Sequence, residues 1–240
     1  MKQENWYDVD TAHGGDFSLS NAFPILMRKV FVWMTLALAI TGITAYGVAS
    51  SPALVGMIFS SKAMFWGLII AEFGLVMAIS GAINRLSLAT ATLLFILYSV
   101  VNGATLSVIF LAYSTTVIAK TFFITAGTFG AMALVGYTTK TDLTSIGKLL
   151  FMALIGIIIA SVVNIFVGSS GLDLIISYVG VLVFVGLTAY DTQKIKEMCR
   201  MAPDAGESMQ KLALLGSLSL YLDFVNLFLY LLRIFGNNKD

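Results

Sequence analysis

Charge is the scarcest property of this sequence. Of its 240 residues only 11% are Asp, Glu, Lys or Arg, whereas 58% are hydrophobic. Soluble domains carry about 25% charged residues, so a surface with this composition cannot face water over most of its area. The net charge of +1 and the lack of a basic stripe in the sequence exclude a nucleic-acid partner. The composition therefore predicts a protein whose main partner is the lipid bilayer.

Cysteine, histidine and proline are also scarce, and each scarcity excludes a class of site. The one cysteine, Cys199, can form neither an intrachain disulfide nor a cysteine-based metal cluster. The one histidine, His13, lies in a polar N-terminal stretch, which excludes histidine catalysis inside the apolar segments. The three prolines lie outside those segments, which argues against the broken helices of many transporters. We expect no enzyme active site and no tightly bound cofactor.

Hydrophobic runs organise the rest of the chain. A helix needs about 20 apolar residues to cross the hydrocarbon core, and seven segments qualify: 29–50, 63–84, 88–112, 117–137, 147–168, 172–192 and 212–235. We predict an all-α polytopic membrane protein, with a seven-transmembrane-helix domain over residues 28–236 and a short polar tail at 237–240.

The N-terminal stretch is polar and acidic. It has neither the basic start nor the early apolar core of a secretory signal. We predict that residues 1–27 are a mobile tail, and that Ser20 or Asn21 caps a helix that opens near Pro24.

Basic residues in the loops indicate the orientation, because Lys and Arg collect on the cytoplasmic side. With a cytoplasmic N-terminus, the inner segments carry Lys2, Arg28, Lys29, Arg85, Lys140, Lys148, Lys194, Lys196, Arg200 and Lys211, and the outer segments carry Lys62, Lys120, Arg233 and Lys239. The majority favours a cytoplasmic N-terminus and an outside C-terminus.

Two spans show a one-sided pattern. The seventh has polar or small residues three or four apart on one face, which predicts a central helix or one that lines a cavity: Gly216, Ser219, Asp223, Asn226, Tyr230 and Arg233. The second has a stripe of small residues, which predicts close packing against a neighbouring helix: Gly67, Ala71, Gly74, Ala78 and Gly81.

Three acidic residues stand out within the spans, where an ionisable side chain costs about 2.5–3.5 kcal/mol. Glu72 is halfway along the second span. At 1.5 Å per residue, Asp191 lies about 14 Å from the cytoplasmic end of the sixth helix and Asp223 about 18 Å along the seventh. Successive helices usually pack together, so the two aspartates can sit at similar depth. Such a pair titrates as one unit and can share a proton or bind a cation.

Structural roles compete with this interpretation. Asp191 can cap a helix or rest at the membrane interface, and Asp223 can be a hydrogen-bond acceptor in a polar bundle core. Glu72 can be an interhelical hydrogen-bond partner. Arg85, at the cytoplasmic end of the second span, can mark topology or hold the aspartates in their ionised forms.

A calcium ion takes six to eight oxygen ligands. The two aspartates together with Ser219, Asn226 and Asn102 supply part of such a shell. This donor set favours transient binding of Ca²⁺ during passage over tight storage.

The stretches GLTAYDTQKIKEM and LSLYLDFVNLFLYLLRIFGN, together with FGAMALVGYTTKTDLTSIGKLLFMALIGIIIASVVNIF, resemble the bacterial branch of the Bax inhibitor-1 family. The resemblance covers roughly residues 20–238. It implies a seven-helix bundle with the last helix central and a pH-sensitive calcium leak gated by an aspartate pair, here Asp191 and Asp223. It also implies an arginine latch from the second helix, whose position corresponds either to Arg85 or to the apolar Ile83.

The sequence is compatible with three functions. The first is a proton-regulated leak for cations, with calcium as the permeant ion. The second is a non-catalytic regulator that binds another membrane protein, such as a quality-control protease or a stress component, a role that the family resemblance also supports. The third is an intramembrane aspartyl protease, which the sequence disfavours because Asp223 lacks a GxGD motif and no proline follows Pro203. We expect a multi-pass protein of the bacterial inner membrane.

Overall fold

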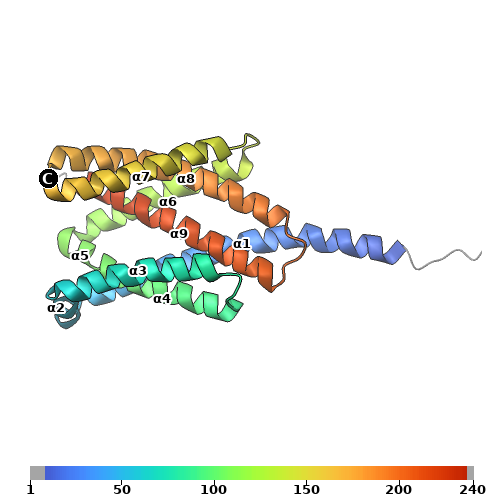
Figure 1. The fold of residues 1–240 in the computed structure, drawn as a ribbon, viewed down its shortest axis with the longest axis horizontal. Helices are drawn as coiled ribbons and strands as arrows, with labels where there is room; N and C mark the ends of the chain where they lie inside the picture. Colours follow the sequence, from blue (N-terminus) through green and yellow to red (C-terminus); the bar gives the residue numbers. More distant parts are fainter. Residues whose placement is uncertain (1–8, 237–240) are drawn as a thin grey trace, which may run out of the picture.

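The computed structural model describes the backbone of residues 9–236 and the side chains of residues 22–236. Within this range every regular element is a helix (Figure 1). The helices are α1 (Val9–Ala49), α2 (Pro52–Phe59), α3 (Lys62–Ala82), α4 (Leu88–Leu106), α5 (Val108–Ala112), α6 (Thr115–Thr138), α7 (Thr144–Val167), α8 (Ser170–Arg200) and α9 (Glu207–Gly236).

Serine residues start several of these helices. The hydroxyl groups of Ser61, Ser87, Ser114 and Ser169 each accept a hydrogen bond from the backbone N–H three residues further on. This bond satisfies one of the donors that the first turn of a helix leaves free. At the other end of α7, Gly168 adopts a left-handed conformation with φ of 67°, which favours glycine. These caps allow the spans to be joined by short loops.

Seven helices in the described part of the chain are long and apolar enough to cross a membrane. They correspond one to one with the seven segments expected from hydropathy, so the predicted fold class is confirmed. The start of α1 and the end of α9 lie at opposite ends of the bundle (Figure 1), as an odd number of crossings requires.

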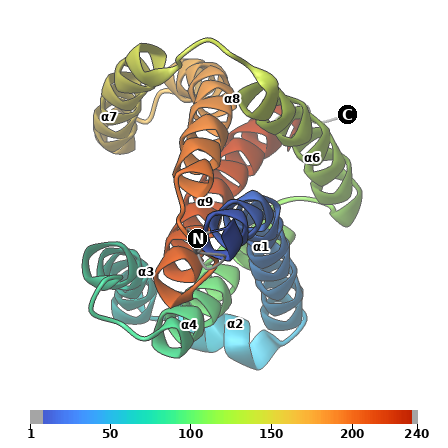
Figure 2. The same cartoon turned by 90° about the vertical axis from the view of Figure 1, so that its right-hand side faces the viewer.

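Helix α9 is the centre of the bundle. It packs against α8, α1, α6 and α4, and the other helices surround it when the bundle is viewed along its length (Figure 2). In its most apolar stretch 67% of the residues are buried, against 6% in α3 and in α7. The central position predicted from the polar face of the seventh span is therefore confirmed.

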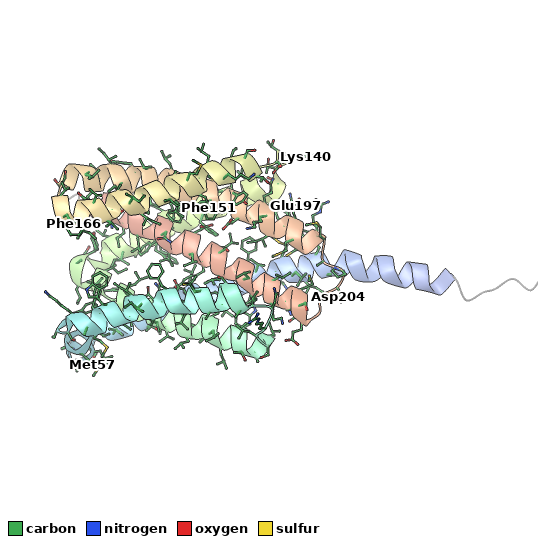
Figure 3. The ribbon with its side chains drawn as sticks, in the orientation of Figure 1. Met57, Lys140, Phe151, Phe166, Glu197 and Asp204 are labelled. Atoms are coloured by element: carbon green, nitrogen blue, oxygen red, sulfur yellow. The ribbon has the colours of Figure 1, made fainter. Side chains whose placement is uncertain are left out.

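The outer faces of the peripheral helices are apolar. Phe166 of α7 is 85% exposed and Phe73 of α3 is 69% exposed, which is the pattern of side chains that contact lipid. Charged side chains gather instead at one end of the bundle, where Lys140, Glu197 and Asp204 are labelled in Figure 3.

The N-terminal segment differs from the prediction. Helix α1 is continuous from Val9 to Ala49 and contains Pro24, so it does not open at this proline. Leu26 and Met27, which the prediction placed in the tail, are buried in the core. Burial of these side chains favours a continuous helix over a break at Pro24, which lacks only one backbone donor. Residues 1–8 and 237–240, at the far ends of the two predicted tails, lie outside the described residues.

The small-residue face of the second span is another difference. Gly67, Ala71, Gly74, Ala78 and Gly81 are all exposed, and a Cβ added at any of the three glycines would meet no atom within 4 Å. The prediction that this face packs against a neighbouring helix of the bundle is therefore wrong. The face that packs on α4 carries larger side chains, including the buried Ile79.

Candidate functional site in the centre of the bundle

Helices α8 and α9 approach each other closely along most of their length. A Cβ added at Gly180 would come within 2.7 Å of the Tyr230 ring, and one added at Gly216 would lie 3.1 Å from Ile195. The two helices run in opposite directions, and these two contacts fix their register. A side chain at Gly180 would overlap the Tyr230 ring, whereas one at Gly216 would be in tight contact with Ile195.

This register brings Asp191 of α8 and Asp223 of α9 to nearly the same depth. They are offset by about three residues, or ~5 Å along the helix axis, and they are close enough to interact electrostatically. The proximity that the sequence predicted for the pair is therefore present.

The two carboxyl groups have different surroundings. Asp223 is only 5% exposed, and its Oδ2 atom has no hydrogen-bond partner among the described residues. Asp191 is half-buried, and the cation that acts on it electrostatically is Lys194, less than one turn further along α8. A buried oxygen without a partner is costly, so a proton, a water molecule or a cation at this oxygen would stabilise Asp223.

Asn226 shares the face of α9 that carries Asp223. It is half-buried, and its Nδ2 donates a hydrogen bond to the Leu222 carbonyl at 2.8 Å. This bond leaves the side-chain oxygen available. Within the described residues no third Asp, Glu, His or Cys joins the pair, so a bound Ca²⁺ would take its remaining ligands from amide, hydroxyl or water oxygens.

Glu72 and Asn102 form a second polar group, separate from the aspartate pair. The Glu72 carboxylate lies beside the side chains of Asn102 and Thr105, and its Oε1 is buried without a hydrogen-bond partner among the described residues. Asn102 accepts a hydrogen bond of 2.9 Å from the Tyr221 hydroxyl. Tyr221 precedes Asp223 by two residues, about 200° around the helix, so the two polar groups lie on different faces of α9.

Tyr221 and Thr41 are central to this second group, and the sequence did not single them out. The Tyr221 hydroxyl lies 2.7 Å from Thr41 Oγ1, so one fully buried tyrosine connects α1, α4 and α9. The available signal was a tyrosine in the middle of the seventh span, where a buried hydroxyl needs a partner. The partners come from residues more than 100 positions away, which the sequence pattern does not reveal.

Arg85 lies in the exposed turn between α3 and α4. The ion pairs found among the described residues join Lys196 and Arg200 to Glu197 and Arg233 to Asp173. The structure thus does not bring Arg85 into an ion pair with the aspartates, and its role as a latch stays a prediction. Ile83, the alternative latch position, is 5% exposed and packs in the apolar core.

The charged end of the bundle holds the central helices in place. Lys196 of α8 donates a hydrogen bond to the Tyr137 carbonyl at the end of α6. Lys211 of α9 donates to the Leu86 carbonyl, and Glu207 accepts from the Leu88 N–H, both at 3.0 Å. These contacts connect α8 and α9 to the neighbouring helices. They lie at the end of the bundle that the loop charges predict to be cytoplasmic.

The fold and the site define a class: a multi-pass helical membrane protein with ionisable side chains buried around a central helix. The sequence matches the family described as "Inhibitor of apoptosis-promoting Bax1" over residues 24–240. It is 50% identical over 214 residues to the inner membrane protein YbhL of Escherichia coli, covering 89% of this chain and 92% of that protein. An uncharacterized protein of Borreliella burgdorferi has the same identity and coverage. Another, from Rickettsia prowazekii, is 45% identical, with 89% and 90% covered. The protein belongs to the Bax inhibitor-1 family, so the predicted family is confirmed.

Proposed function

We propose that this protein is a pH-sensitive cation leak of the bacterial inner membrane, with calcium as the permeant ion and Asp191 and Asp223 as the gate. The similarity to the inner membrane protein YbhL supports the location. The observation that carries the proposal is the buried Asp223 carboxyl, with an unpartnered oxygen, beside Asp191 in the middle of the bundle.

The charge of the pair decides between two arrangements of the gate. When both carboxylates are ionised they repel each other and attract a cation into the space between α8 and α9. When the pair holds a proton, one carboxyl can donate a hydrogen bond to the other, which draws the two helices together and weakens the attraction for the ion. Acidification therefore lowers the flux.

Calcium entry into proteoliposomes tests the proposal. Asp223→Asn keeps the size of the side chain but removes its charge, and we expect the initial rate at neutral pH to fall about tenfold, equal to 1.4 kcal/mol of ion stabilisation. Asp173→Asn is the matched control, because Asp173 is half-exposed at the far end of α8 and pairs with Arg233. Equal rates for the wild type and Asp223→Asn in folded protein would contradict the proposal.

A non-catalytic regulator is the second candidate function. The outward glycine face of α3 favours it, because Gly67, Gly74 and Gly81 would allow a helix of another membrane protein, such as a protease or a stress component, to approach closely. Replacing Gly74 with Leu should then abolish a crosslink to the partner while calcium flux persists. An unchanged crosslink pattern would count against the regulator.

A further inference from the structure

A cavity of about 280 Å³ lies between α1, α6 and α9, in the half of the bundle where α9 ends. Helix α1 packs on α4 and α9, whereas α6 packs on α8 and α9. The space between α1 and α6 is closed by α9, by the short helix α5 and by Leu106 at the end of α4. The walls are apolar and include Leu38, Ile118, Phe122, Phe224 and Phe228.

Water has few partners in this cavity. Thr41 and Thr115 contribute hydroxyl groups to the wall, and the Thr41 hydroxyl is already bonded to the Tyr221 hydroxyl and to the Ser99 carbonyl. A buried water needs two to four polar partners, and apolar cavities of about 150 Å³ stay dry and accept hydrocarbon ligands. The volume of about 280 Å³ exceeds that of such a dry cavity and is large enough for an apolar group.

The cavity is continuous with the lipid-facing surface. Phe123 lines it and is 73% exposed, and Ile43 of α1, next to the lining residue Gly42, is 75% exposed. Both side chains belong to the apolar outer face of the membrane spans. The hydrocarbon of the bilayer therefore reaches the mouth of the cavity without crossing a polar surface.

We propose that this cavity binds one acyl chain of a membrane phospholipid, from the leaflet next to the end of α9. The bound chain fills the space between α1 and α6 and packs against Phe224 and Val225, the two residues that follow Asp223. The lipid is thus a structural ligand of the central helix. Its binding does not depend on whether the protein conducts ions.

Photocrosslinking from the acyl chain tests this site. The protein is placed in vesicles of phosphatidylethanolamine and phosphatidylglycerol that contain a tracer phospholipid with a diazirine near the end of one chain. Phe224 and Val225 are 4% and 7% exposed, so they can be labelled only by a chain that enters the cavity. We expect labels on these residues and none on Leu231, which is also 7% exposed in α9 but does not line the cavity.

A pair of glycine variants in α1 gives the matched control. Gly42 lines the cavity and Gly47 does not, and a Cβ at either would meet no atom within 4 Å. Gly42→Leu fills the cavity and should lower labelling of Phe224 and Val225 about tenfold, the change that follows a loss of 1.4 kcal/mol in binding. Gly47→Leu should leave the labelling unchanged.

Two outcomes would overturn the proposal. The first is labelling of the wild type only on outward residues such as Phe123 and Ile43, with Phe224 and Val225 unlabelled. The second is equal labelling of Phe224 and Val225 in the wild type and in Gly42→Leu, which would mean that the labelling chain does not occupy the cavity. If Gly42→Leu does not fold, Ala119→Leu fills the same cavity from α6.

Discussion

At the scale of single residues, the polar groups inside the bundle are divided between two faces of α9. One face carries Asp223, whose carboxyl group interacts electrostatically with that of Asp191 in α8. The other carries Tyr221, whose hydroxyl is held by Thr41 and Asn102. The Asp223 group changes its charge with its proton content. The hydroxyl groups of Tyr221 and Thr41 are neutral, although the Glu72 carboxyl lies beside Asn102 in the same polar group. The proposed gating therefore concerns the Asp223 group, and we expect the Tyr221 network to align the helices.

Tyr221→Phe tests the structural role of this network. The ring stays in place against Phe95 and Tyr98, but Asn102 loses its donor. Hydrogen bonds between membrane helices contribute about 0.6 kcal/mol on average and up to ~1.7. We expect a loss near the upper value because Tyr221 has no exposed surface.

The free energy of unfolding in detergent micelles measures this effect. Tyr178→Phe is the control, since Tyr178 of α8 is 53% exposed and its hydroxyl should add little. If the two variants are equally stable, the network does not align the helices.

The sequence identified the residues of the aspartate pair but not their surroundings. Asp191 and Asp223 stand out because charge is rare in these spans. Tyr221 and Thr41 do not, because an isolated hydroxyl is common in apolar helices. Their role depends on which helices are neighbours, and that information resides in the packing.

At the scale of helices, α8 is fixed between α9 and α6 by close backbone contacts. Gly136 of α6 meets Ala189 of α8 so closely that an added Cβ would overlap the Ala189 carbonyl. This contact lies two residues before Asp191. The position of Asp191 relative to α9 therefore depends on the α6–α8 contact.

Gly136→Ala should push α6 and α8 apart. Overpacking costs about 1–3 kcal/mol, which should appear as a lower free energy of unfolding. Gly127→Ala in the same helix is the control, since its Cβ would meet no atom within 4 Å and alanine favours the helix. If the two variants have the same free energy of unfolding, α6 and α8 can move apart at Gly136 without destabilising the protein.

Hydropathy predicted the helices well but not how far they extend or which way they face. Length and apolar composition decide whether a segment spans the membrane, so the seven spans could be predicted. The extension of α1 through Pro24 depends on burial of Leu26 and Met27, which the local proline signal does not report. The glycine face of α3 has the same spacing whether it meets a neighbour inside the bundle or faces outward.

At the scale of the whole molecule, seven crossings place the two ends of the chain on opposite sides of the membrane. The loop charges predict a cytoplasmic N-terminus, and the hydrogen bonds of Lys196 and Lys211 lie at the end of the bundle that this prediction places inside. We therefore predict that the hydrogen bonds that hold α8 and α9 to their neighbours lie on the cytoplasmic side of the membrane.

Single-cysteine labelling tests the orientation. The natural Cys199 is buried and can be replaced by serine. In intact cells a membrane-impermeant maleimide should label Ser61→Cys, in the loop before α3, and should not label Thr141→Cys, in the loop before α7. The opposite result would reverse the topology.

The pH dependence of calcium flux tests the central claim most directly. Initial rates are measured in proteoliposomes across a pH series for the wild type, Asp191→Asn and Asp223→Asn. If the pair is the gate, the wild-type rate rises with pH, by up to about tenfold per pH unit for each proton released. Each single variant should respond less steeply, because one of the two coupled groups no longer titrates. Three superimposable profiles, or no flux above that of empty vesicles in folded protein, would contradict a gate made of Asp191 and Asp223.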